Sequence, residues 1–247
     1  NLDYKPEMIR QAELSSSAQL VNEYGWIWLW RNGSPSKLTL DVYNYYLGPG
    51  SSPEQNRELQ AYWLQLETEW LRCQTSLAGV LAFCYLANNY GYTGDWFIDD
   101  IKDLKPAPAL QWFQHCFAPA AVFINLTDER YTRHIKPHEP GTPLLFNLAG
   151  INNHAIAVKG SVKLSLVNVT GKKVVEKNVD VELAPFIRSG YPVSIDLPAE
   201  PGGYLLLAEF IAGDGSGPVI SRRYIKIGGT GDYHYFEMKP GLLKIGQ

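Results

Sequence analysis

The chain is poor in the residues that build redox and metal sites, with three cysteines and five histidines in 247 residues. Cys73, Cys84 and Cys116 form no CxxC spacing and sit among apolar residues. This pattern predicts buried free thiols, and so low a count excludes a disulfide framework. The histidines form no HExxH pattern. We therefore expect neither a metal site nor a cofactor.

Long apolar runs and basic runs are also missing. Without a stretch of 18 apolar residues the sequence predicts no transmembrane helix. A formal charge of −3 and the lack of any basic cluster argue against nucleic acid or a membrane surface as a partner. The Gly-x-Ser-x-Gly pattern of serine hydrolases does not occur. What remains is a globular protein with room for one large domain or two ordinary ones.

The chain begins at Asn1, without an initiator methionine or a signal-like apolar region. We therefore expect it to be a piece of a larger protein. Its compartment stays open, because three Asn-x-Ser/Thr sites matter only in a secretory pathway. A periplasmic or secreted location is one compatible alternative.

Aromatic residues are abundant at 13%, and six of the seven tryptophans precede residue 100. In this half, apolar spacing and breaker residues predict helices over residues 6–21, 38–47, 53–74 and 109–117. The run 79–86 predicts a strand covered on both faces, and 120–126 a second strand. Residues 20–30 fit either a continued helix or a buried strand after Gly25. This alternation is typical of βαβ units.

After a charged, proline-rich linker at 127–143 the period changes to two. Strands are predicted at 144–148, 160–169, 172–183, 193–197, 203–212 and 219–227, with a seventh candidate at 155–158. The aromatic tail after residue 232 either packs on the first half or serves as a partner surface. The predicted fold is an α/β, partial TIM-barrel-like segment over residues 1–130. An all-β immunoglobulin-like sandwich follows over residues 131–247.

The first half is too short for a complete eight-stranded barrel, which needs about 200 residues. It matches the last units of one, and residues 20–26, Leu-Val-Asn-Glu-Tyr-Gly-Trp, carry a resemblance. They resemble the segment of family 2 glycoside hydrolases in which a Glu-Tyr-Gly triplet ends a late barrel strand. The helix at 53–74 and the strand at 78–83 are similar to the closing units of that barrel.

The resemblance implies glycoside hydrolysis, with Glu23 as a catalytic carboxylate. In the family the glutamate of the triplet is the nucleophile, and the acid/base lies in an Asn-Glu pair on an earlier strand. Asn22-Glu23 fits that second motif as well, so both roles stay open for Glu23. The chemistry needs two carboxylates. Asp95, Asp99 and Asp100 are candidates for the second, or a preceding region supplies it. Carbohydrate is the expected ligand, with Trp26, Tyr92, Asp95 and Trp96 as its binding residues.

Each of these residues also has a purely structural interpretation. Glu23 would be a polar residue on a helix face, or an ion-pair partner of Arg10, Lys37 or Arg72. Glu67 and Glu69 would be solvated or ion-paired on the long helix. Trp26, Trp28 and Trp30 would be core residues, and the acidic residues between 95 and 103 a solvated loop.

Three functions follow from these patterns. The first is a C-terminal fragment of a glycoside-hydrolase-like protein, inactive alone and completed by a missing N-terminal region. The second is a non-catalytic carbohydrate-binding or scaffold module. The third is an interaction protein that self-associates, because an incomplete barrel exposes strand edges that a second copy would cover.

Overall fold

The computed structural model describes residues 1–88, 92–230 and 232–238. The chain divides into two compact units. We call residues 5–117 the helical unit, and residues 1–4 together with the chain from 118 onward the sandwich unit. In the parts of the chain that the structure describes, no helix is both long and apolar enough to cross a membrane.

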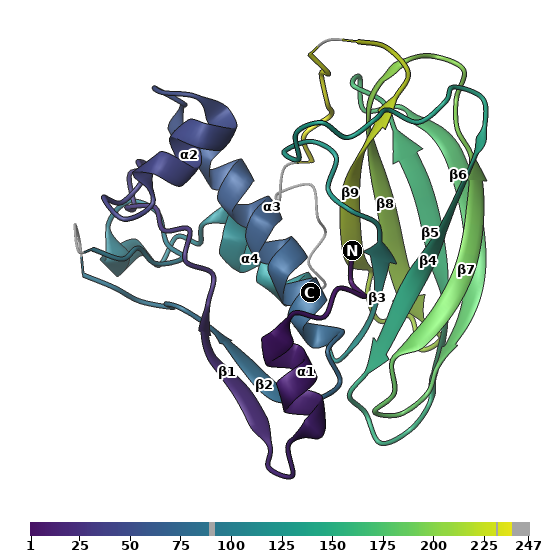
Figure 1. Ribbon diagram of the computed structural model, residues 1–247, viewed down its shortest axis with the longest axis horizontal. Coiled ribbons are helices and arrows are strands. Elements are labelled where there is room, and N and C mark those ends of the chain that lie inside the picture. The colour runs from purple at the N-terminus through teal and green to yellow at the C-terminus, as the bar shows by residue number, and fades with distance from the viewer. Residues whose placement is uncertain (89–91, 231, 239–247) are drawn as a thin grey trace. The chain divides into compact units, whose positions relative to one another are not determined.

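The helical unit contains four α-helices, a short 3-10 helix and two strands among its described residues (Figure 1). In chain order these are α1 (Glu7–Leu14), β1 (Gln19–Tyr24), α2 (Leu40–Leu47), α3 (Pro53–Arg72), β2 (Leu77–Ala82), η1 (Ile101–Asp103) and α4 (Pro108–Cys116). The first predicted helix is too long: α1 ends at Leu14, because three serines follow that favour turns over helix. Residues 20–30 were expected to continue the helix or to form a strand after Gly25. Instead the strand β1 ends at Tyr24, before Gly25.

Helix α3 begins where the sequence predicts. The Ser52 hydroxyl accepts a hydrogen bond from the Gln55 N–H, and the Gln55 side chain accepts one from the Ser52 N–H. This capping box satisfies two otherwise unpaired donors, and Pro53 fits the first turn because it lacks an N–H. Such local signals made α3 predictable from the sequence.

Strand β2 pairs with β1 in parallel, with Val21 opposite Val80 and Tyr24 opposite Ala82. The prediction that β2 is covered on both faces is wrong, since Leu81 is 55% exposed. Together with its crossover helices the pair forms one βαβ unit. Among the described residues no third strand joins this sheet, so a partial TIM barrel is not observed.

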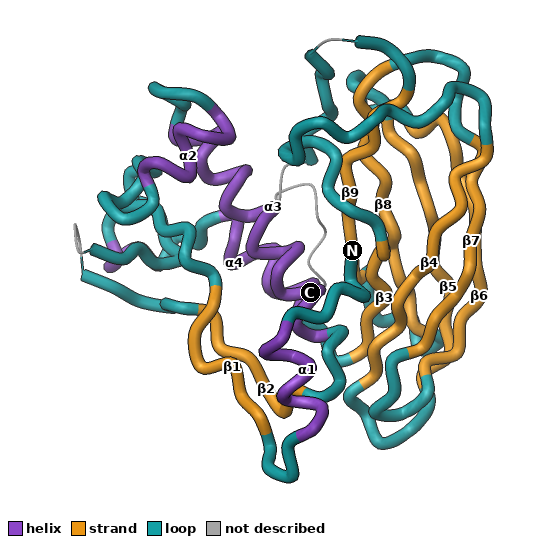
Figure 2. Tube along the Cα trace, in the orientation of Figure 1, coloured by secondary structure: helices purple, strands orange, loops and turns teal. Residues whose placement is uncertain are grey.

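Among the described residues of the sandwich unit, seven strands form two antiparallel sheets, whose strands are drawn in orange in Figure 2. They are β3 (Ala120–Asn125), β4 (Pro143–Asn152), β5 (Val158–Val167), β6 (Lys173–Leu183), β7 (Ser189–Asp196), β8 (Gly202–Ala212) and β9 (Val219–Ile227). One sheet has the order β3-β4-β7 and the other β6-β5-β8-β9. In the candidate strand at 155–158, residues 155–157 lie in a loop and Val158 begins β5, so the seventh strand is β3. Although we predicted β3 as part of the α/β segment, it pairs with β4.

The strand order differs in one respect from a constant-type immunoglobulin domain. There the fourth strand joins the sheet of the first, second and fifth. Here the fourth strand, β6, pairs with β5 in the other sheet. One side-chain feature of immunoglobulin domains is present. The Tyr204 hydroxyl near the start of β8 donates to the Glu200 carbonyl at 2.7 Å. That bond is a tyrosine corner, which ties the sixth strand to the preceding turn.

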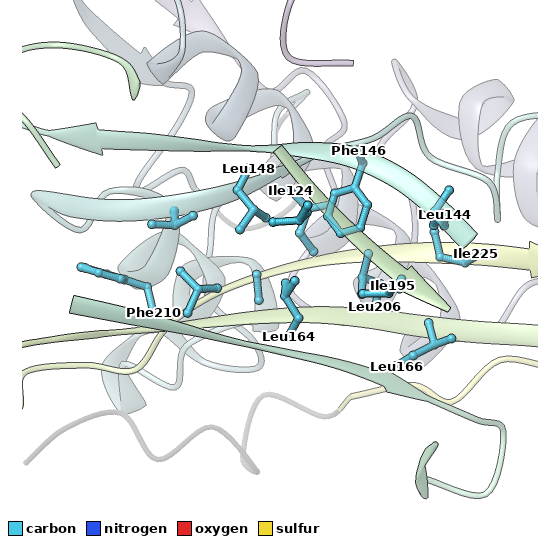
Figure 3. Close-up of a cluster of buried hydrophobic side chains, with 14 of the residues drawn as sticks. Ile124, Leu144, Phe146, Leu148, Leu164, Leu166, Ile195, Leu206, Phe210 and Ile225 are labelled. Atoms are coloured by element: carbon cyan, nitrogen blue, oxygen red, sulfur yellow. The ribbon is translucent and has the colours of Figure 1, made fainter. Parts of the chain in front are cut away.

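Alternating apolar residues from both sheets form the core of the sandwich (Figure 3). Leu164, Leu166 and Leu206 are at most 1% exposed. Burying a side chain of this size stabilises a fold by roughly 1.5–3 kcal/mol. The period of two in the sequence reports this packing directly, so the strands of the second half were predictable.

The proline-rich segment before β4 is tied to β9. The His138 N–H donates to the Lys226 carbonyl at 2.8 Å, and His138 Nε2 lies 2.7 Å from Glu129 Oε1. The other oxygen of Glu129 accepts a hydrogen bond from the Lys226 N–H at 2.7 Å. The Glu129 carboxylate raises the pKa of His138 above its usual value.

This pair predicts a pH-dependent stability of the sandwich unit. Because the pKa of His138 is raised in the folded state, the contribution is complete below the ordinary histidine pKa of about 6.5. It is lost as the pH rises through the higher folded pKa of His138. Between pH 5 and 9, the free energy of unfolding in urea should therefore fall less in His138→Gln than in the wild type. His154→Gln, at an exposed position, is the control, and equal pH dependence in the wild type and His138→Gln would contradict the assignment.

The described part of the tail, residues 232–238, packs on the sandwich unit. Tyr235 lies edge to face on Tyr224, with ring centroids 5.1 Å apart. The Arg130 guanidinium lies 4.7 Å from the Tyr224 ring centroid and pairs with Glu237 at 2.5 Å. Gly203 leaves the room that Tyr235 needs, since a Cβ there would lie 2.6 Å from its ring.

Candidate active site

Glu23 lies at the carboxyl end of β1 and its side chain is exposed. The end of β2 is beside it, because the Phe83 N–H donates to the Tyr24 carbonyl at 2.9 Å. In parallel α/β folds, ligands bind at this edge of the sheet. The helical interpretation of Glu23 is wrong. Glu23 also forms no ion pair with Arg10, Lys37, Arg72 or any other residue that the structure describes.

A tight turn follows Glu23 and presents Trp26 to solvent. Gly25 has a φ of +85°, and the Ile27 N–H donates to the Gly25 carbonyl at 2.8 Å. Trp26 is 57% exposed, while Trp28 is buried. The two indole rings are stacked with centroids 6.3 Å apart, and Trp28 Nε1 donates to the Phe83 carbonyl at 2.8 Å. Trp26 therefore has the exposed ring that stacking on a sugar requires.

Cys84 follows the end of β2, near Glu23. Its pKa is raised, mainly by burial, and the charges of Asp95 and Glu23 contribute because they oppose a thiolate. The thiol is half-buried. A thiol in such surroundings stays protonated, so Cys84 is not expected to act as a nucleophile.

Asp95 is an ion-pair partner with a side chain that is only 1% exposed. Arg31 Nη2 lies 2.6 Å from Asp95 Oδ2, and the carboxylate also accepts from the N–H groups of Ala87 and Phe97. Four donors on one buried carboxylate leave little capacity for a sugar hydroxyl. The structure therefore gives Asp95 a framework role instead of the direct binding role that we expected.

The two remaining aromatic candidates are placed in opposite ways. Trp96 is 2% exposed and packs edge to face on Phe113 of α4, with centroids 5.5 Å apart. Its ring face is therefore closed to a ligand, contrary to its predicted role. Tyr92 is 74% exposed and open to solvent.

The Arg31–Asp95 pair lines a pocket of about 270 Å³ in the helical unit. Other lining residues are Trp30, Asn32, Asn88, Thr93, Asp99 and Asp100. Pockets for drug-sized ligands begin at about 300 Å³, so this one suits a molecule of one ring. Its wall needs glycine at position 94, because a Cβ there would lie 1.9 Å from the Leu29 carbonyl oxygen. Glu23, Trp26 and Tyr92 do not line this pocket.

Buried polar side chains of the helices hold the irregular segment between β1 and the pocket. The Ile27 carbonyl accepts from the Tyr43 hydroxyl at 2.8 Å and from Gln60 Nε2 at 3.0 Å. Asn56 Nδ2 donates to the Gly33 carbonyl at 3.0 Å. Backbone without a regular strand partner needs such bonds when it is buried. These polar residues were not predicted from the sequence, where the apolar stripe of α3 is the recognisable signal.

For the acidic residues of α3, the solvated interpretation is wrong. Glu69 is fully buried, and its carboxylate accepts from Gln65 Nε2 at 2.8 Å. Glu67 is half-buried, and burial raises the pKa of its carboxyl to about 7. Neither residue belongs to a solvated helix face.

No protein-family model matches the chain, and no curated protein matches it. Among solved structures it is similar to the exo-chitosanase CsxA of Amycolatopsis orientalis. The TM-score is 0.50 and the identity 13%, over 77% of this chain and 21% of that one. A β-D-mannosidase of Dictyoglomus thermophilum aligns with a TM-score of 0.48 and 16% identity, over 70% of this chain and 19% of that one.

At this identity the likeness to the exo-chitosanase shows the fold alone. More of the chain lies in β-strands than in helices, and its fold is similar to that of a part of the exo-chitosanase. It spans 21% of the length of that enzyme.

Proposed function

We propose that the chain is the C-terminal part of a family 2-like glycoside hydrolase, and that Glu23 is one of its two catalytic carboxylates. In this proposal residues 1–130 belong to a barrel-like catalytic domain, and residues 131–247 form the sandwich that follows it. The substrate is a carbohydrate, and the chain does not hydrolyse it alone.

The position of Glu23 carries the proposal. An exposed carboxylate at the carboxyl end of a parallel strand is directed to the edge where barrel enzymes bind their substrates. Trp26, three residues further on, offers an exposed ring beside it. Tyr92 adds a second exposed aromatic side chain in the loop after β2.

The second carboxylate comes from outside the helical unit in this proposal. A retaining enzyme needs it about 5–5.5 Å from Glu23 and an inverting enzyme about 6.5–9.5 Å away. Asp95 is engaged by Arg31, and Asp99 and Asp100 pair with Lys105 and Lys102. A preceding region of the same protein would add strands to the open edges of β1 and β2 and supply the missing group.

The test is to compare this chain with the full product of its reading frame on a panel of nitrophenyl glycosides. We expect no turnover by the chain alone and hydrolysis of at least one glycoside by the longer protein. A reading frame that begins near residue 1, with no hydrolysis by its product, would contradict the proposal.

The alternative is a non-catalytic carbohydrate-binding or scaffold module. The pocket at Arg31 and Asp95 favours it, since its described lining residues all belong to the helical unit. Binding of a monosaccharide by the chain, quenched by Asn32→Ala and unchanged by Glu23→Gln, would support this alternative. A dimer whose dissociation unfolds the helical unit would instead support self-association.

A further inference from the structure

The end of β1 carries a bulge at Glu23. Between Val21 and Tyr24 the pairing with β2 shifts by one residue, so β1 has an extra residue there. Glu23 and the residue before it are both exposed, whereas successive side chains of a regular strand point to opposite faces. Bulges change the direction of a side chain and are over-represented next to active sites. The direction of the Glu23 carboxylate therefore depends on what holds this bulge.

Tyr24 holds the end of the bulge from two sides. Of the six residues of β1, all of which the structure describes, Tyr24 alone is buried. Its hydroxyl lies 2.7 Å from the hydroxyl of Thr68 in α3. The Thr68 hydroxyl donates to the Leu64 carbonyl at 2.6 Å, so at its contact with Tyr24 it accepts the tyrosine O–H. On the sheet side, the Tyr24 carbonyl accepts a hydrogen bond from the Phe83 N–H at 2.9 Å.

The close approach of α3 to this strand end depends on a glycine. A Cβ at position 25 would lie 2.7 Å from Leu64 Cδ2, and the φ of Gly25 is +85°, which a glycine adopts without strain. Thr68 is fully buried, and Tyr24 is 5% exposed. Burial raises the pKa of the Tyr24 hydroxyl above its usual value, so this group stays protonated and remains a donor.

We propose that Thr68 is a positioning residue, whose hydroxyl holds the Tyr24 side chain and thereby the bulge that directs Glu23. The inference rests on the proposed function of Glu23 and adds a residue to it. Thr68 is buried and touches no substrate itself. A misplacement of about 1 Å at a catalytic group can cost roughly a hundredfold in rate, so a fixed strand end next to Glu23 matters for the chemistry.

A first experiment measures hydrogen exchange of the Phe83 amide by NMR in this chain. That proton is bonded to the Tyr24 carbonyl, so its exchange reports how firmly the end of β1 is held. Tyr24→Phe removes the donor, and Thr68→Val removes the acceptor while it keeps the shape of the side chain. Each variant should exchange the Phe83 proton roughly three- to tenfold faster, the factor that one hydrogen bond contributes. Thr68→Ser keeps the hydroxyl and should match the wild type.

A second experiment measures kcat and KM of the same variants in the full reading-frame product, on its best nitrophenyl glycoside. Tyr24→Phe and Thr68→Val should lower kcat by about ten- to hundredfold, because the carboxylate is misplaced. KM should stay close to the wild-type value, since no contact with the sugar is removed. Thr68→Ser should retain the wild-type kcat. A residue that served packing alone would lower the free energy of unfolding without this selective loss.

Tyr204→Phe is the matched control for both experiments. It removes the hydroxyl of a similarly buried tyrosine, together with its bond to the Glu200 carbonyl, in the sandwich unit. Exchange of the Phe83 proton and the kcat should both match the wild type in this variant.

Three outcomes separate this inference from the proposed function. Wild-type exchange at Phe83 in Tyr24→Phe, with the chain folded by circular dichroism, overturns the role of the bond between Tyr24 and Thr68. Tyr24→Phe keeps the buried ring, so this result decides the matter even if Thr68→Val does not fold. Faster exchange with an unchanged kcat overturns the positioning role. Faster exchange, with no hydrolysis by the wild-type reading-frame product, leaves the bond as the anchor of β1 and removes only the enzyme proposal.

Discussion

Replacing Glu23 with Gln should lower glycoside hydrolysis by the full reading-frame product by about 10²–10⁴-fold, the range that a positioned acid–base group contributes. The amide keeps the shape of the side chain and removes the charge and the proton that the chemistry uses. Because Glu23 is exposed and unpaired with any described residue, the change should leave the free energy of unfolding unchanged. The measurement is kcat/KM on the best nitrophenyl glycoside, together with urea unfolding.

The matched control is Glu7→Gln, which removes an exposed carboxylate from α1. It should retain wild-type hydrolysis. A Glu23→Gln protein with kcat/KM within threefold of the wild type would end the assignment of a catalytic role to this residue. Loss of sugar affinity with unchanged kcat would instead place Glu23 among binding groups.

The second large effect is expected on stability, at the Arg31–Asp95 pair. Asp95→Ala should lower the free energy of unfolding by about 3–5 kcal/mol, the usual loss when one partner of a buried ion pair is removed. The side chains of Arg31 and Asp95 are 9% and 1% exposed, so the remaining guanidinium would be left in the protein interior. The N–H groups of Ala87 and Phe97 would lose their acceptor as well. Urea unfolding, with the m-value checked for two-state behaviour, measures the loss.

Lys102→Ala is the appropriate comparison, because it breaks the exposed pair with Asp100 in the same region. Exposed pairs contribute little, so its unfolding curve should overlay that of the wild type. Replacing both members, with Arg31→Met and Asp95→Leu, should recover part of the loss, since a buried pair can be exchanged for apolar residues at little cost. A double variant as unstable as Asp95→Ala would show that hydrogen bonds to the loop matter more than the charges.

Sequence reasoning succeeded where the signal is local. The capping residues Ser52 and Pro53 marked the start of α3, and the alternation in β5 marked the sandwich. It failed where a distant partner decides the outcome. The burial of β2 depends on how many strands flank it, and the place of β3 depends on its pairing with β4.

In the candidate site, too, the residue marked by a local motif was placed as predicted, and the residues with distant partners were not. The Glu-Tyr-Gly triplet drew attention to Glu23 without any knowledge of the fold, and an exposed Trp26 next to it is consistent with that choice. The roles of Asp95 and Trp96 were assigned from their place in an acidic, aromatic loop. Asp95 pairs with Arg31 and Trp96 packs on Phe113. Both partners come from other parts of the chain, and no spacing in the sequence predicts these contacts.

The amide side chains on α3 have a consequence for anyone who maps this protein by saturation mutagenesis. Asn56 and Gln60 are 2% and 1% exposed and bond to the carbonyls of Gly33 and Ile27. Their replacement would disturb the loop beyond β1 and depress activity scores, as a ligand contact would. Sensitivity at these two positions therefore reports loop support, and a map of functional residues needs a separate abundance measurement to tell the two apart.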